Sequence, residues 1–163
     1  MDKYVQMAKR LGMIDAKIIS ASDICIDPRA ILKCKWGCDD PYTQKCDDRG
    51  LPYDLRVQIV KSYQKILLIR SHDARKLYRT ALKIERQAFL DGYRYAFTLN
   101  SCHFCLSCEV LRGGECTSPD KIRPCDQLFG IDTYKTVKKQ GLPCKVLKDK
   151  TKQPNRYAYI LID

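Results

Sequence analysis

Four cysteines lie within fifteen residues in the stretch CHFCLSCEVLRGGEC. The first three, Cys102, Cys105 and Cys108, are separated by two residues each, so one tight loop can present three thiolates to the same face of a metal centre. This C-x-x-C-x-x-C run is typical of iron–sulfur proteins, whereas a tetrahedral zinc site more often takes two separated C-x-x-C pairs. The spacing therefore favours a [4Fe–4S] cluster, and zinc and disulfides remain as alternatives.

Cys116 is the expected fourth ligand, because Gly113 and Gly114 permit the chain reversal that would return it to the site. In two-cluster ferredoxins the cysteine after such a run ligates the other cluster, so Cys116 is also a candidate for a second site. His103 lies inside the run, but a residue next to a ligand tends to point away from the metal, and we expect it to be outer-sphere or on the surface. The predicted cofactor ligands are Cys102, Cys105, Cys108 and Cys116.

A second group of thiols, Cys34, Cys38 and Cys46, lies in the segment 33–52, which is rich in Asp, Gly and Pro. Three ligands with no local fourth indicate a distant fourth ligand, a cluster with one open iron, or unligated loop cysteines. The distant candidates are Cys25, Cys116, Cys125 and Cys144. Except for Cys116, these are otherwise expected to be small buried hydrophobic residues. A second [4Fe–4S] cluster is thus a hypothesis in addition to the first.

The length of 163 residues suits a single domain, residues 1–163, with a core large enough to fold without disulfides. The first 17 residues contain charges and no apolar signal-peptide core, and no window approaches the ~18 apolar residues of a membrane span. We therefore expect a cytoplasmic protein with no membrane partner. In a reducing compartment, ten cysteines indicate metal or redox chemistry, although their even number also fits disulfides.

The chain is basic, with 30 Lys and Arg against 19 Asp and Glu. A [4Fe–4S] cluster held by four thiolates carries about −2, which offsets part of that excess. The expected partner is an acidic redox protein. Nucleic acid is not favoured, because no aromatic residues are interleaved with the basic ones in a recognisable module. The basic residues that nucleic acid would use are Arg75, Arg79, Lys83, Arg86 and the lysine-rich segment 135–152.

Hydrophobic periodicity and turn residues predict an α/β fold with a mixed sheet of about five strands, flanking helices and cysteine-rich loops at one end. Strands are expected over 16–26, 65–70, 93–99, 144–149 and 156–163, and helices over 53–63, 71–92, 119–130 and 132–141. In the longest helix, Ser71 is the expected N-cap and Gly92 the residue after the C-cap. Its apolar stripe consists of Ala74, Leu77, Ala81, Ile84 and Ala88.

The predicted strands 16–26 and 93–99 each lead directly into a cysteine loop, the segments 33–52 and 102–119. If these strands lie side by side and parallel, both loops meet at one edge of the sheet, where open α/β sheets gather their sites. This arrangement predicts two metal sites at the same end of the molecule.

Three stretches carry a family resemblance: LKCKWGC with Cys46 downstream, IERQAFLDGYRYAFTLNSCHFCLSC, and GGECTSPDKIRPCDQLFGIDTYKTVKKQGLP. In this order and over nearly the whole chain, they resemble an uncharacterised family of predicted metal-binding proteins found mainly in anaerobic archaea and bacteria. The matching positions are Lys33, Cys34, Gly37, Cys38, Cys46, Glu85, Arg86, Gly92, Tyr93, Cys102, Cys105, Cys108, Cys116, Pro119, Arg123, Pro124, Gly130, Ile131 and Asp132.

The sequence departs from this family at two places. Asp47 and Asp48 stand where members typically have two prolines, and Cys125 stands where they usually have serine, which makes it a weaker ligand candidate. The resemblance implies metal binding through iron–sulfur chemistry and implies no reaction. Two function classes follow: a small electron carrier or cluster-holding subunit for a redox partner, or an enzyme that uses a three-cysteine cluster with an open iron as Lewis acid or sulfide carrier.

Overall fold

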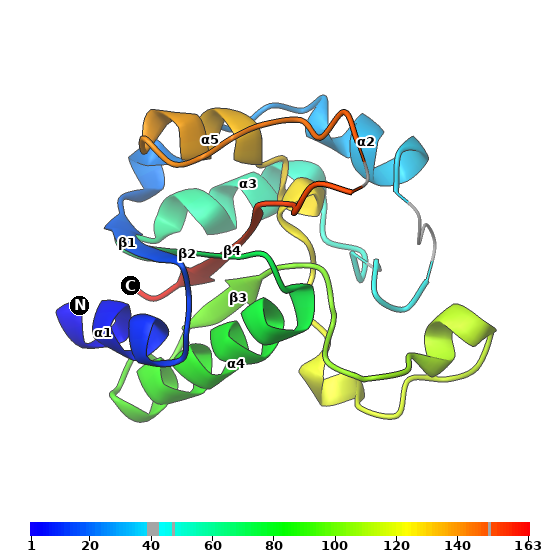
Figure 1. Ribbon diagram of the computed structural model, residues 1–163, viewed down its shortest axis with the longest axis horizontal. Coiled ribbons are helices and arrows are strands. Elements are labelled where there is room, and N and C mark those ends of the chain that lie inside the picture. The colour runs from blue at the N-terminus through cyan, green and yellow to red at the C-terminus, as the bar shows by residue number, and fades with distance from the viewer. Residues whose placement is uncertain (39–42, 47, 150) are drawn as a thin grey trace.

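A four-stranded antiparallel sheet lies between two layers of helices in the computed structural model (Figure 1). The structure describes residues 1–38, 43–46, 48–149 and 151–163. The strands are β1 (Asp15–Ile19), β2 (Ile66–Ser71), β3 (Phe97–Leu99) and β4 (Arg156–Leu161). The α-helices are α1 (Asp2–Arg10), α2 (Ala30–Trp36), α3 (Tyr53–Ser62), α4 (Ala74–Leu90) and α5 (Thr133–Lys139). Four 3₁₀ turns complete the described elements: η1 (Ala21–Asp23), η2 (Glu109–Arg112), η3 (Pro119–Lys121) and η4 (Asp126–Phe129).

The sheet has the strand order β1-β2-β4-β3, and every neighbouring pair is antiparallel. The prediction of a mixed sheet of about five strands is therefore wrong, although the α/β class is confirmed. The expected strand 144–149 is missing from this sheet. Its Val146 is 73% exposed, so this apolar side chain does not pack against the core. The chain thus reaches β4 through an irregular segment rather than through a terminal hairpin.

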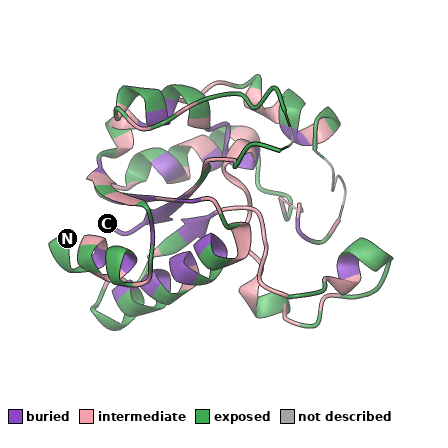
Figure 2. Ribbon diagram, in the orientation of Figure 1, coloured by how far each residue is buried: buried purple, intermediate pink, exposed green. Residues whose placement is uncertain are grey.

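Both faces of β2, one of the two central strands, are buried. Alternate residues of a strand point to opposite faces, so Ile66 and Leu68 pack with the helices α2, α3 and α5, and Leu67 and Ile69 pack with α1 and α4. All four side chains are fully buried. This explains why residues 65–70 form a continuous apolar run, which correctly predicted a buried strand. The result is a three-layer arrangement with a hydrophobic core on each side of the sheet (Figures 1 and 2).

Helix α4 confirms the strongest helical pattern of the sequence. Leu77, Ala81, Ile84 and Ala88 are all buried against the sheet, as their spacing predicts. The N-cap is Asp73 rather than Ser71, because the Asp73 carboxylate accepts a hydrogen bond from the Lys76 amide at 2.8 Å. Among the described residues, no helix combines the length and the apolar character needed to cross a lipid bilayer.

Other predicted elements differ at their ends. The strand predicted over 16–26 stops at Ile19, because Ser20 and Asp23 form a capping box that starts η1. Residues 93–96 do not join β3, and the helix predicted over 119–130 is two short 3₁₀ turns. Helix α2 occupies the start of the segment 33–52, which was expected to be a loop. The helices predicted over 53–63 and 132–141 are confirmed as α3 and α5.

The strands that lead toward the two cysteine loops are not neighbours. β1 and β3 occupy opposite edges of the sheet, and the alternation of the antiparallel pairs makes them run in opposite directions. The expected parallel, side-by-side pairing of these strands is therefore wrong. Any proximity of the two cysteine groups has to come from the loops themselves.

Candidate metal centre

The carboxyl-side cysteines lie on a segment that leaves the sheet after β3 and projects beyond it (Figure 1). Most of its residues are exposed or partly buried (Figure 2). The segment encloses one side of a cavity of about 620 Å³. The cysteines that line this cavity are Cys102, Cys105, Cys108 and Cys116. The four cysteines predicted as ligands therefore line one cavity.

Two arginines of α4 hold the backbone of the triple-cysteine run. The Arg75 guanidinium donates to the carbonyls of Cys105 and Leu106, at 3.2 Å each. Arg79 donates to the Phe104 carbonyl at 3.0 Å and lies over the ring of the same residue. Two of the four helix residues that nucleic acid would use are thus engaged by the cysteine loop. Their positive charge stands beside thiols that a metal would require as thiolates.

The cavity is lined by more positive than negative side chains. Arg75, Arg156 and Lys45 line it together with His72, and the acidic residue among its lining is Asp73. Lys45 is a buried member of this lining, at only 5% exposure. A buried cation at a cysteine-lined cavity favours the negative charge that metal-bound thiolates bring, because each charge offsets the other's desolvation.

The residue types at this cavity fit a thiolate-ligated metal or cluster. Four sulfur donors supply the full ligand set of a tetrahedral zinc ion or of a [4Fe–4S] cluster. All ten cysteines of the chain are described, and none of them forms a disulfide. Within the described part of the chain, no three His, Cys, Asp or Glu side chains are already grouped so that they could hold a metal ion. The cavity therefore fits a metal centre in the type of its donor atoms and in the shared location of the four cysteines.

The chain that returns from the cysteine segment is fixed to the core by a buried ion pair. Arg123 donates to the Glu85 carboxylate on α4, with Nε 3.0 Å from Oε2, and it also lies over the ring of Phe97. The same carboxylate accepts from the Thr98 amide in β3 at 2.7 Å. Glu85 on α4 thus contacts both β3 and the returning loop at Arg123. These two contacts fix the positions at which the cysteine segment leaves the core and returns to it.

A buried tyrosine ties α4 to the chain that returns from the cysteine segment. The hydroxyl group of Tyr78 on α4 donates its one proton to the carbonyl of Lys121 at 2.6 Å. Burial, followed by the charge of Cys102, raises the pKa of Tyr78 well above its usual range. The phenol therefore stays protonated and keeps its hydrogen bond to the returning chain.

The amino-terminal cysteines and Cys125 affect one another's protonation. Interaction with the Cys125 thiol lowers the pKa of Cys34, on α2, to about 7, whereas the same interaction raises the pKa of Cys125 far above its usual value. Burial, followed by the charge of Cys38, raises the pKa of Cys46.

The two cysteine groups approach each other through their loops. The side-chain oxygen of Gln44 accepts a hydrogen bond from the Cys116 amide at 3.1 Å. Lys45, next in the chain, lines the cavity of the carboxyl-side cysteines. The two loops therefore contact each other through this hydrogen bond and not through paired strands. Sequence spacing contains no signal for it.

The remaining cysteines stand apart from both groups. The Cys25 thiol lies 3.9 Å from the carbonyl of Asp23, and the Cys144 thiol lies 3.4 Å from the carbonyl of Tyr134. Neither Cys25 nor Cys144 is fully buried, so the interpretation of these two as small buried core residues is wrong. His103 has Nδ1 2.8 Å from the Ser101 carbonyl and lines the cavity of the four carboxyl-side cysteines.

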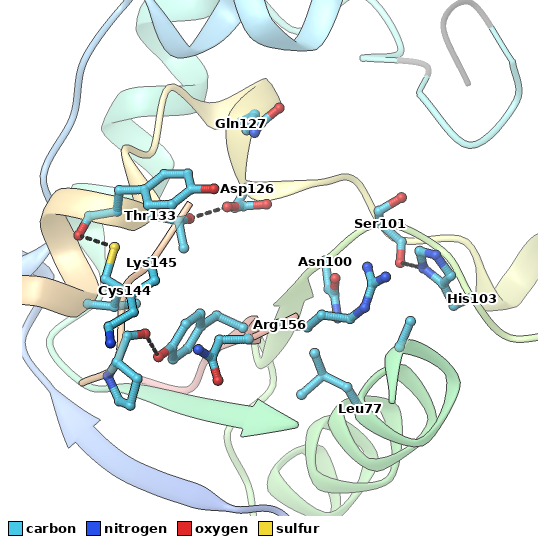
Figure 3. A pocket seen from close by; sticks show the side chains of 16 residues that line it. Leu77, Asn100, Ser101, His103, Asp126, Gln127, Thr133, Cys144, Lys145 and Arg156 are labelled. Carbon is cyan, nitrogen blue, oxygen red and sulfur yellow. Dashed lines mark hydrogen bonds between the residues drawn. The ribbon is translucent and has the colours of Figure 1, made fainter. Parts of the chain in front are cut away.

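A second, polar cavity of about 270 Å³ adjoins the first (Figure 3). His103, Arg156 and Ala74 line both cavities. In the view of Figure 3, Asn100 and Arg156 lie between His103 and the hydrogen-bonded pair of Asp126 and Thr133. Sequence patterns gave no indication of this cavity, because its lining comes from distant segments, among them the start of α4, η4, α5 and β4.

Comparison with protein families gives one match and two negative results. The model of the family described as "Predicted metal-binding protein (DUF2284)" matches residues 17–162. Neither the curated proteins nor the solved structures give a significant match. The matched range contains both cysteine groups and all elements from β1 to β4 except the first residues of β1. The chain therefore belongs to the DUF2284 family of predicted metal-binding proteins.

Proposed function

We propose that this protein holds a [4Fe–4S] cluster through Cys102, Cys105, Cys108 and Cys116 and acts as a small electron carrier or as the cluster-holding subunit of a larger redox enzyme. One observation carries the proposal: these four cysteines line the same cavity. Their C-x-x-C-x-x-C spacing favours iron over zinc. When bound, such a cluster supplies one-electron transfer; the protein supplies ligands, charge and access.

The residues around the cavity support this role in distinct ways. Arg75 and Arg79 hold the loop backbone, so the three thiolates of the run would be presented by a fixed loop. Lys45 and Arg156 bring positive charge that offsets the charge of four thiolates. Tyr78 ties α4 to the returning end of the cysteine segment through its hydrogen bond to the Lys121 carbonyl. None of these residues needs to move a proton or bind a substrate for electron transfer to occur.

The proposed partner is an acidic redox protein. The chain carries a net charge of +11, and the tip of the cysteine segment exposes apolar side chains, with Leu106 79% and Leu111 52% exposed. Both leucines line the cavity. A basic surface with apolar residues next to the cluster suits transient docking, because charge steers the encounter and apolar contact brings the redox centres close.

Lys45 provides a test of the electrostatic part of the proposal. Lys45→Met removes a buried positive charge from the cavity, so the reduced and more negative cluster loses stabilisation and the midpoint potential should fall. A unit charge at an effective dielectric constant of ~20 contributes on the order of 1–2 kcal/mol, or roughly 50–100 mV for one electron. Protein-film voltammetry measures the shift. Lys83→Met, an exposed α4 residue away from the cavity, should leave the potential unchanged; equal shifts in both variants would count against the account.

The adjoining cavity favours a second candidate function, an enzyme whose cluster has one open iron. Cys116 would then not be a permanent ligand, and a small anion held by Arg156 and Asn100 would reach the cluster from the polar cavity. This candidate predicts that Cys116→Ala keeps its iron and that cyanide, a small anion that binds open iron, changes the electron paramagnetic resonance spectrum. The electron-carrier proposal predicts loss of iron in that variant and no response of the wild type to cyanide.

A further inference from the structure

A cavity whose lining includes four basic residues lies beside the cavity of the carboxyl-side cysteines. This basic cavity has a volume of about 240 Å³ and shares Lys45 and Ile122 with the cysteine cavity. It also adjoins an apolar groove of about 360 Å³ next to the edge strand β3. Leu51, Phe97 and Phe129 line both the basic cavity and the apolar groove. A molecule that fills the basic cavity can therefore extend along the groove.

The basic cavity contains a buried arginine whose charge is incompletely compensated. Arg56, on α3, is 6% exposed and lines the cavity. Its Nη1 donates to the Leu128 carbonyl at 2.7 Å, and the Asp48 carboxylate lies 3.8 Å from the same nitrogen, beyond hydrogen-bonding distance. Its Nε is buried and has no hydrogen-bond partner in the described part of the chain. An anion in the cavity would stabilise this guanidinium, because a buried charge without a close counter-charge is costly.

The remaining charges of the basic cavity favour a single negative charge. Its other basic residues are Lys45, Arg49 and Arg123, and its described acidic residues are Asp48 and Asp120. Arg123 is held by the Glu85 carboxylate. Asp120 lies 2.6 Å from the ammonium group of Lys121. The excess of basic groups is therefore small, which suits a carboxylate better than a phosphate dianion. A planar guanidinium also matches the two oxygens of a carboxylate.

The apolar groove fits the hydrocarbon part of such an anion. Among the described residues that line it, Arg94 is the one charged residue, and the others are aliphatic or aromatic. Tyr95 is 84% exposed and Phe97 is 36% exposed, so apolar surface of the groove faces water. An aliphatic chain that covers this surface gains up to about fourfold in affinity for each buried methylene group. The groove and the basic cavity together therefore complement an amphipathic anion.

We propose that the basic cavity and the apolar groove form one binding site for a small organic carboxylate with an aliphatic chain. The carboxylate lies in the basic cavity with Arg56, and the chain passes Phe97 into the groove. Because Lys45 lines both the basic cavity and the cysteine cavity, the carboxylate is the end of the ligand nearer to the cysteines. No cysteine is among the described residues that line this site. The inference therefore goes beyond the proposed electron-transfer cluster and does not depend on it.

Isothermal titration calorimetry of the anaerobically purified protein with octanoate tests the site. We expect a single octanoate to bind per chain. Butyrate has the same carboxylate and a shorter chain that does not reach along the groove, so it should bind about tenfold more weakly or worse. Octanamide keeps the chain and lacks the charge, so its affinity should fall by a similar factor. No binding of octanoate, or binding no tighter than that of butyrate or octanamide, would overturn the proposal.

Two exposed aromatic residues test the position of the chain. Tyr95→Ala removes a ring from the groove and should weaken octanoate about fivefold or more, with the affinity for butyrate unchanged. Phe89→Ala is the matched control, because Phe89 is 56% exposed on α4 and lines neither the basic cavity nor the groove. It should leave both affinities at the wild-type level. Equal octanoate affinities in the two variants would contradict the proposed position of the chain.

Basic residues test the position of the carboxylate. Arg56→Lys keeps the charge and loses the planar fork, so octanoate and butyrate should both weaken about threefold or more. Arg49→Ala removes an exposed basic side chain from the same lining, does not disturb the core, and should weaken the two carboxylates by one common factor while sparing octanamide. Arg86→Ala, exposed on α4 and outside this lining, is the matched control and should change none of them. Carboxylate affinities that are unchanged in both Arg56→Lys and Arg49→Ala would overturn the proposal.

Discussion

Replacement of Cys102, Cys105 or Cys108 by Ala, one at a time, is expected to remove the cluster of the carboxyl-side site. Each variant leaves three thiolates where a [4Fe–4S] cluster takes four, so about four irons and four sulfides per chain should be lost and the brown colour should fall sharply. Iron and acid-labile sulfide analysis after anaerobic purification gives the result. The far-ultraviolet circular dichroism spectrum should be preserved, because these residues lie outside the two hydrophobic cores.

Cys116→Ala and Cys144→Ala complete this series. Cys116 lines the same cavity and its replacement should also cost iron, unless it serves the amino-terminal site, in which case the loss would appear there. Cys144 lines the other cavity and its replacement should leave the iron content at the wild-type level. Unchanged iron in all three variants of the C-x-x-C-x-x-C run would refute the assignment.

Glu85→Ala is expected to destabilise the protein by about 3–5 kcal/mol, the usual effect of removing one partner of a buried ion pair. The Arg123 guanidinium would lose its counter-ion, and the Thr98 amide would lose its acceptor. Both ion-pair side chains are largely shielded from water, at 11% and 18% exposure. Urea denaturation monitored by circular dichroism measures the change in the free energy of unfolding.

The control for this prediction is the exposed pair of Arg112 and Glu109 in the cysteine segment. Glu109→Ala should change the free energy of unfolding by no more than about 1 kcal/mol, because exposed pairs are screened by solvent. A Glu85→Ala variant as stable as Glu109→Ala would contradict the role assigned to the ion pair. It would mean that other contacts, such as the hydrogen bond from the Tyr78 hydroxyl to the Lys121 carbonyl, hold the returning loop to α4.

Local patterns predicted the elements whose signals are complete in themselves. α4 has an apolar stripe at helical spacing, and α5 has the N-cap Asp132 and a glycine with positive φ at Gly141. β2 is an uninterrupted apolar run between polar ends. Predicted element boundaries were wrong where a local side-chain hydrogen bond ended an element early. At Ser20, for example, the capping box with Asp23 ends β1 before the predicted strand end. Strand order could not be predicted, because it depends on pairing between segments far apart in the chain, such as β2 with β4.

The candidate site likewise has one part that the sequence predicts and another part that depends on tertiary packing. The triple-cysteine run is readable from sequence because its three ligands are neighbours in the chain. The relation of Cys125 to Cys34 depends on how η4 packs against α2, and no sequence spacing expresses it. The only available signal was that Cys125 is one of four candidates for a distant fourth ligand. Buried Lys45 was missed for the same reason, since its contact with the cavity comes from tertiary packing.

The most direct measurement of the central claim is the metal and sulfide content of the anaerobically purified protein, combined with its low-temperature electron paramagnetic resonance spectrum after reduction. The account predicts equal amounts of iron and acid-labile sulfide, about four of each per cluster, and a signal of a reduced [4Fe–4S] cluster that disappears in the Cys102→Ala/Cys105→Ala/Cys108→Ala variant. Zinc without sulfide at the wild-type site would contradict it.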